Sequence, residues 1–322
     1  MSDDLQEQLL DYLRDAHSIE EQALAQLREA PKIAGGAGLS HAFEDHLKET
    51  EGHEQLTRRL LEGRDAGPSR FKDAVMAVGG KGFVWFARLQ PDTPGKLAAH
   101  ALSYEALEHG SYEMLARVAQ RAGEQDVVDA ARSIATEEEA MMERIEGLLE
   151  ESATASLPDD PSTDLTDKVR SYLADAHALE AQATQLLERA TDHAGSDGLR
   201  QAYEDHLAET REHSRLVEER LEALGGKPNM LKDAMMKLGG LNWATFFAAQ
   251  PDTPGKLAVF ARAFEYLEIG GYEQLRHVAQ RAGDSQTVDM VTSILLQERG
   301  AAQRLASSFD EAATAALQAQ AR

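Results

Sequence analysis

The sequence predicts an all-α protein built from two tandem copies of a four-helix bundle, and three observations lead to this prediction. The chain of 322 residues repeats itself at a fixed offset, so that Tyr12 returns as Tyr172 and His46 as His206. Apolar residues recur at the three- and four-residue spacing of helices, and no stretch alternates as a strand does. Proline and glycine fall where the helical pattern breaks, as they do at helix ends.

The repeat defines the domain organisation. Residues 90–97, for example, return as residues 250–257. Between the copies lies the segment 152–163, which is rich in small residues and contains two prolines. Because such segments connect domains rather than form them, we expect one bundle over residues 1–153 and a second over residues 162–322.

Each copy should contain four long helices. The third helix begins at Thr93-Pro94, where Asp92 provides an N-cap and the proline favours a helix start. Roughly thirty residues separate the second and third helices, and within them 71–76 and 83–86 look like short helical pieces on a long crossover. In the first copy the main helices are expected over residues 4–30, 38–62, 92–123 and 124–151.

Charged side chains occupy inward positions of these helices. On the fourth helix Glu138 lies between Ile134 and Met141, on the apolar stripe. Its neighbours behave as solvent-facing residues, since Glu137, Glu139 and Glu143 become Gln297, Arg299 and Gln303 in the second copy, whereas Glu298 retains the inward glutamate. The other helices carry inward residues too: Glu20 on the first, His46, Glu49 and His53 on the second, and Glu108 on the third, with Glu105 at the edge of its stripe.

Four of these carboxylates should meet in one layer of the core, because Glu20, Glu49, Glu108 and Glu138 each lie near the middle of a helix. Ionised and unpaired, each would cost several kcal/mol, an order-of-magnitude figure for buried charge. No Lys or Arg lies on the central stripes, so a pair of divalent or trivalent cations is the simplest partner. Carboxylate and imidazole donors together suit iron or manganese. On this reasoning Glu138→Leu should stabilise the metal-free first domain and abolish its metal binding.

Three positions leave alternatives open. His17 fits a hydrogen-bonded core or rim histidine better than a ligand. His46 fits either a ligand or an outer partner one turn away from the metal. Glu108 is favoured over Glu105 as a ligand, although the spacing also allows Glu105 or both. The corresponding residues of the second copy are His177, His206 and Glu265 for the open positions.

Composition excludes several other functions. The formal net charge of −23 disfavours binding to nucleic acid or to anionic membranes, which requires clustered Lys and Arg. The sequence has no cysteine, which excludes disulfides, thiolate metal sites and cysteine nucleophiles. The acidic, amphipathic start of the chain is unlike a signal peptide, and the apolar runs are too short to span a bilayer. We therefore expect a cytoplasmic protein.

The sequence resembles the YciE/YciF-like family of ferritin-like, rubrerythrin-related bacterial stress proteins. The residues that carry the resemblance are Glu20, His46-x-x-Glu49-Thr50-x-x-His53, Glu105-x-x-Glu108-x-x-x-Tyr112 and Glu137-Glu138. The resemblance covers both halves and implies a di-metal site in each. The implied ligands are Glu20, Glu49, His53, Glu108 and Glu138, and then Glu180, Glu209, His213, Glu268 and Glu298. The fourth helices depart from the Glu-x-x-His pattern common in ferritin-like proteins, because Met141 and Ala301 occupy the histidine position.

We therefore expect a duplicated ferritin-like protein with a two-metal centre of iron or manganese in each domain, handling oxygen, peroxide or iron in stress response. Peroxidase, catalase-like and ferroxidase activities all remain open. Relatives of this type tend to dimerise, and covalent fusion supplies the partner at high effective concentration, so we expect an intramolecular pseudo-dimer with possible further homo-oligomerisation. The alternative is a metal-free helical interaction or scaffold protein with a degenerate ferritin-like core.

Overall fold

The computed structural model describes residues 3–68, 93–158, 160, 163–227 and 253–320. Within these ranges the chain forms helices joined by turns and short loops, with no strand, which confirms the predicted all-α class. The chain divides into two compact units, Met1–Ser156 and Leu157–Arg322. Of the helices described, none combines the length and the apolar character needed to cross a membrane.

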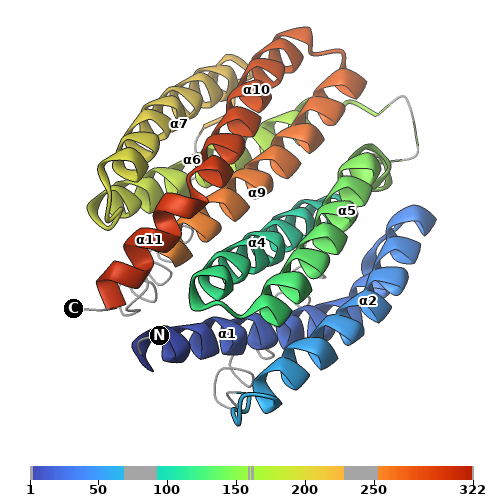
Figure 1. Ribbon diagram of the computed structural model, residues 1–322. Coiled ribbons are helices and arrows are strands. Elements are labelled where there is room, and N and C mark those ends of the chain that lie inside the picture. The colour runs from blue at the N-terminus through green and yellow to red at the C-terminus, as the bar shows by residue number, and fades with distance from the viewer. Residues whose placement is uncertain (1–2, 69–92, 159, 161–162, 228–252, 321–322) are drawn as a thin grey trace. The chain divides into compact units, whose positions relative to one another are not determined.

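In its described residues the first unit is a bundle of four long helices (Figure 1). These are α1 (Asp3–Leu27), α2 (Ala37–Glu62), α4 (Thr93–Ala122) and α5 (Gln125–Ala155), with a short 3₁₀ helix, η1 (Ala30–Ile33), between the first two. Helix α1 packs against α2 and α4, and α5 packs against the same two helices, so the four enclose one core. The short helices expected at 71–76 and 83–86 lie outside the described residues.

The second unit repeats this arrangement, which confirms the tandem duplication. Its helices are α6 (Thr166–Asp192), α7 (Asp197–Ala223), α9 (Thr253–Ala282), α10 (Ser285–Ser307) and α11 (Phe309–Gln320). Helix α6 packs against α7 and α9, and α10 packs against the same pair. The single helix α5 of the first unit corresponds here to α10 followed by α11, with a break at Ser308.

The helix ends differ from the expected ones by a few residues. Helix α1 ends at Leu27 because Pro31 cannot continue an α-helix and lies in η1 instead. Helix α5 continues to Ala155, four residues beyond the expected end, and buries Ser152 and Ala153. The hydroxyl of Ser156 then accepts a hydrogen bond of 2.9 Å from the backbone N–H of Gly95, which joins the end of α5 to the start of α4.

A glycine in each unit brings the loop after the first helix against the start of the third. Gly35 and Gly195 have φ angles of +72° and +73°, a left-handed conformation in which glycine meets no Cβ penalty. A Cβ atom at these positions would also collide with the rings of Pro94 and Pro254, the prolines that begin α4 and α9. The bundle ends are therefore closely packed, and the charged residues lie in the core between them.

Candidate metal centre

Six charged or titratable side chains are buried together in the first unit. The 3.6-residue helical repeat turns each of them inward from its helix, and each is at most 4% exposed. The group consists of Glu20 on α1, His46 and His53 on α2, Glu105 and Glu108 on α4, and Glu138 on α5.

These side chains form two adjacent donor groups that share Glu138. Donor atoms of His46, Glu105, Glu108 and Glu138 all lie within 4.8 Å of one another, and those of Glu20, His53 and Glu138 do the same. The Oε2 atom of Glu138 lies 3.3 Å from His46 Nε2, and its Oε1 atom lies 2.9 Å from His53 Nδ1. The two carboxylate oxygens of Glu138 therefore face different histidines, and Glu138 belongs to both donor groups.

The donor atoms approach one another without forming hydrogen bonds. His46 Nε2 lies 3.0 Å from Glu105 Oε2, yet neither atom has a hydrogen-bond partner among the described residues. An octahedral ion with ligands at about 2.1 Å places neighbouring donor atoms about 3 Å apart. The same lack of partners holds for Glu20 Oε2, His53 Nδ1 and both oxygens of Glu108 and of Glu138. The spacing and direction of these atoms fit a shared coordination sphere.

The charges fit a pair of divalent ions as well. Four ionised carboxylates carry a charge of −4, which two divalent cations balance, and the histidines add nitrogen donors without charge. The sequence predicted that no basic residue on the central stripes would balance this charge. Arg262 is buried among the described residues of the second unit, but its guanidinium lies over the ring of Tyr266, 5.1 Å from the ring centroid.

Without metal, protons balance the charge unequally across the group. Burial favours the neutral form of Glu138, but its contacts with His46 and His53 outweigh this and lower its pKa to about 2. Burial likewise opposes protonation of His53, yet Glu138 and Glu20 raise its pKa to about 9. Glu138 is therefore the carboxylate that stays ionised, held between two imidazoles.

The remaining carboxyl groups hold protons more strongly. Burial, followed by the charge of Glu138, raises the pKa of Glu20 to about 8 and that of Glu108 well above its usual value. Burial raises the pKa of Glu105 to about 7, although His46 acts against it. A metal ion binding here must displace these protons.

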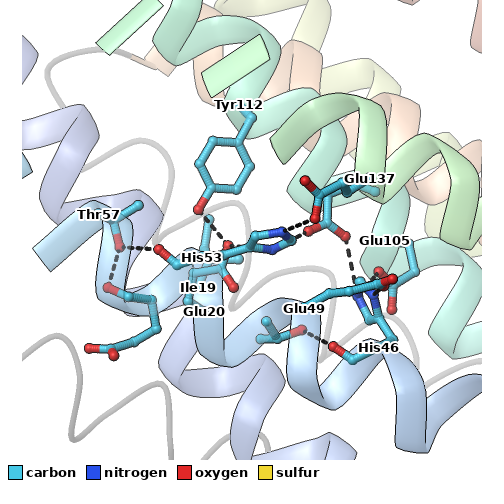
Figure 2. Close-up of polar contacts among 12 residues, drawn as sticks. Ile19, Glu20, His46, Glu49, His53, Thr57, Glu105, Tyr112 and Glu137 are labelled. Atoms are coloured by element: carbon cyan, nitrogen blue, oxygen red, sulfur yellow. Dashed lines mark hydrogen bonds and ion pairs between the residues drawn. The ribbon is translucent and has the colours of Figure 1, made fainter. Parts of the chain in front are cut away.

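Glu49 lies in a different place from the one expected. Its side chain is 36% exposed, and its Oε2 atom lies 2.9 Å from His46 Nδ1, the nitrogen that faces away from the donor group. Glu105, expected at the edge of its stripe, is 3% exposed and completes the four-carboxylate layer in place of Glu49. The expected layer is thus corrected in one member, because helical periodicity fixes the direction of a side chain only to within part of a turn, and packing decides which side chains are buried. His46, whose role was open, directs Nε2 into the donor group (Figure 2).

Two outer contacts were not expected from the sequence. His53 Nε2 lies 3.0 Å from Glu137 Oε2, so Glu137, interpreted as a solvent-facing residue, contacts the second histidine (Figure 2). The hydroxyl of Tyr112 donates to Glu20 Oε1. The repeat gave no signal for Glu137, because Glu143 changes to glutamine in the second copy just as Glu137 does.

His17 lies outside the six-residue group. Its Nε2 atom lies 2.9 Å from Glu54 Oε1, and together with Glu21 these side chains form a separate acidic group in which Arg58 contacts Glu54. The second copy has Ala181 and Ser214 in place of Glu21 and Glu54, and its His177 is half-buried. The structure therefore places His17 as a hydrogen-bonded histidine away from the layer.

The second unit reproduces the inner geometry. Its two donor groups are His206, Glu265, Glu268 and Glu298, and Glu180, His213 and Glu298. His206 Nε2 lies 2.7 Å from Glu265 Oε2, and His213 Nδ1 lies 2.8 Å from Glu298 Oε1. Glu209 again contacts the outer nitrogen of His206, at 3.1 Å, and Tyr272 donates to Glu180. The atoms without hydrogen-bond partners among the described residues are the counterparts of those in the first unit.

Comparison with known proteins places the sequence in a family. The model of a family described as a domain of unknown function, DUF892, matches the chain twice in tandem, over residues 4–157 and 165–318. No solved structure matches the chain. The two matches follow the two helical units, and the chain therefore belongs to the DUF892 family, of which it contains two tandem copies.

Proposed function

We propose that this chain is a two-metal carboxylate protein, which holds a pair of iron or manganese ions in each domain and handles oxygen, peroxide or iron. The supporting observation is the set of buried donor atoms that recurs in both units without hydrogen-bond partners among the described residues. A buried polar group without a partner costs about 1–3 kcal/mol. Ligation of an ion removes this cost and gives a reason for the same arrangement to occur twice.

Each donor group would hold one ion. In the first domain His46, Glu105 and Glu108 would hold one ion, and Glu20 and His53 the other, with Glu138 shared between them. The second domain would use the equivalent residues, with Glu298 as the shared carboxylate. The mixture of carboxylate and imidazole donors favours iron or manganese over magnesium or calcium, which prefer oxygen ligands.

The surrounding residues prepare the site for chemistry on small oxygen species. A bound pair of such ions would supply Lewis-acid and redox chemistry. The chain contributes a buried position, the charge balance of four carboxylates, and fixed ligand orientations: Glu49 contacts His46 from outside, and Tyr112 donates to Glu20. Outer contacts of this kind orient ligands and set their basicity.

The resemblance to YciE/YciF-like stress proteins supports a role in oxidative or iron stress. A peroxidase reaction would require an external electron donor, and because the chain has no cysteine, a rubredoxin-type donor would be a separate protein. A catalase-like reaction would need no such donor. We place the activity among peroxidase, catalase-like and ferroxidase chemistry.

Metal analysis of protein purified without chelator or nickel tests this proposal. We expect two ions in each domain, in accordance with the two donor groups. After chelation, Mn(II) or Fe(II) added anaerobically should stabilise the protein by about 2.7 kcal/mol at one hundred times the dissociation constant. Mg(II) at the same concentration is the control and should stabilise it much less, because it makes poor use of imidazole donors. Absence of bound ions together with unchanged melting would favour a metal-free helical interaction protein.

A further inference from the structure

The two candidate centres have the same inner donors but different outer partners at the second histidine. In the first domain His53 Nε2 lies 3.0 Å from a carboxylate oxygen of Glu137. In the second domain His213 Nε2 lies 2.7 Å from the amide oxygen of Gln297. Both partners accept the imidazole N–H, so both hold the ring with Nδ1 facing the donor group. Only Glu137 adds a negative charge.

Exposed charges on the same helix differ in the same direction. The positions of Glu139 and Glu143 on α5 are occupied by Arg299 and Gln303 on α10. Helix α10 is therefore less negative than α5, but of these exchanged positions it is Glu137 and Gln297 that contact a histidine of the donor groups.

The physical effect of this difference falls on a bound cation. A carboxylate that accepts the outer N–H of a ligating histidine makes the imidazole a stronger donor and places negative charge near the ion. An amide oxygen orients the ring in the same way but lacks the charge. Changes of such outer partners typically alter metal affinity by about 10- to 100-fold. Because Glu137 is 47% exposed and solvent screens it, the lower end of this range, about tenfold, applies.

From these contacts we infer that the two centres are functionally different: the first domain retains a divalent transition-metal ion beside His53, and the second domain binds its counterpart beside His213 more weakly and exchanges it. The inference rests on the proposed two-metal function and adds a division of roles between the domains. A carboxylate–imidazole–metal arrangement defines the tight position, and an amide–imidazole–metal arrangement defines the exchangeable one.

Reciprocal exchange of the outer partners in the full-length protein tests the inference. The chelated chain is titrated with Mn(II), and the free ion is followed by its electron paramagnetic resonance signal. Of the four ions expected in the parent, those beside His53 and His213 should fall into two affinity classes about tenfold apart. Glu137→Gln should weaken the tight class by about tenfold, and Gln297→Glu should strengthen the weak class by a similar factor. Glu139→Gln is the matched control, since it removes the same charge from an exposed position of the same helix, and it should leave both classes unchanged.

The outcomes separate this inference from the proposed function. If no variant and not even the parent binds Mn(II), the two-metal function itself is wrong. If the parent binds Mn(II) in a single affinity class, or if Glu137→Gln behaves as Glu139→Gln does, the centres are equivalent and the inference is overturned. Melting of the chelated proteins is a check on folding, because each exchange preserves the hydrogen-bond acceptor and should leave the melting temperature nearly unchanged.

Discussion

Replacing Glu108 with leucine should stabilise the metal-free protein, whereas replacing Glu138 should destabilise it. Both oxygens of Glu108 are buried without hydrogen-bond partners among the described residues, and burial raises the pKa of this carboxyl well above its usual value. Leucine has a similar volume and removes a cost of about 2 kcal/mol. For a domain of this size that gain corresponds to about 4–8 °C in melting temperature. Glu138, in contrast, lies between His46 and His53, and its loss removes the carboxylate that contacts both histidines, at a cost of up to about 3 kcal/mol.

Metal content should distinguish the two variants a second time. Glu108 belongs to one donor group and Glu138 to both, so Glu108→Leu should bind one ion fewer and Glu138→Leu two ions fewer. Calorimetry of the chelated proteins and metal analysis of the loaded ones measure both effects. Glu139→Leu, at an exposed position of α5, is the control and should change neither. If Glu108→Leu instead lowered the metal-free stability by several kcal/mol, Glu108 would have a protein partner, and the argument from unsatisfied donors would fail.

Two further predictions concern pH and the outer shell. Folding raises the pKa of Glu20 to about 8, that of Glu105 to about 7 and that of His53 to about 9. A group with a raised pKa stabilises the folded state fully below its ordinary pKa, and this contribution is lost as the pH rises through the raised value. The stability of the metal-free protein should therefore fall between about pH 5 and pH 9, while stabilisation by Mn(II) grows over the same interval. Thermal melts across this range measure both effects. Stabilisation by Mn(II) that did not depend on pH would contradict the displacement of protons by the metal. Glu49→Ala should weaken Mn(II) binding by about tenfold or more without lowering the number of ions bound, because Glu49 contacts only the outer nitrogen of His46; loss of an ion would instead make Glu49 a ligand.

Much of the fold follows from the sequence because its signals are local. The spacing of apolar residues specifies the helices, and Pro94 and Gly123 mark the ends of α4 within a residue or two. The inward direction of Glu20, Glu108 and Glu138 follows from the same periodicity, since each lies at the centre of an apolar stripe. The end of α5 was missed because residues 152–155 have the composition of a linker, yet tertiary packing buries part of this segment and keeps it helical.

The sequence by itself determined that charged side chains enter two equivalent helical cores, whereas the tertiary structure decided which of them meet. Glu49 was expected beside the inward histidines and Glu105 at the edge of its stripe, and the packed helices instead bury Glu105 and leave Glu49 partly exposed. Sequence also treated Glu138 as one of four equal carboxylates, which is why its replacement was expected to stabilise the metal-free domain. Its position between two histidines reverses that expectation. Helical periodicity fixes the direction of a side chain to within part of a turn, but contacts of about 3 Å depend on rotamers and on the relative placement of four helices, which are properties of the packed core.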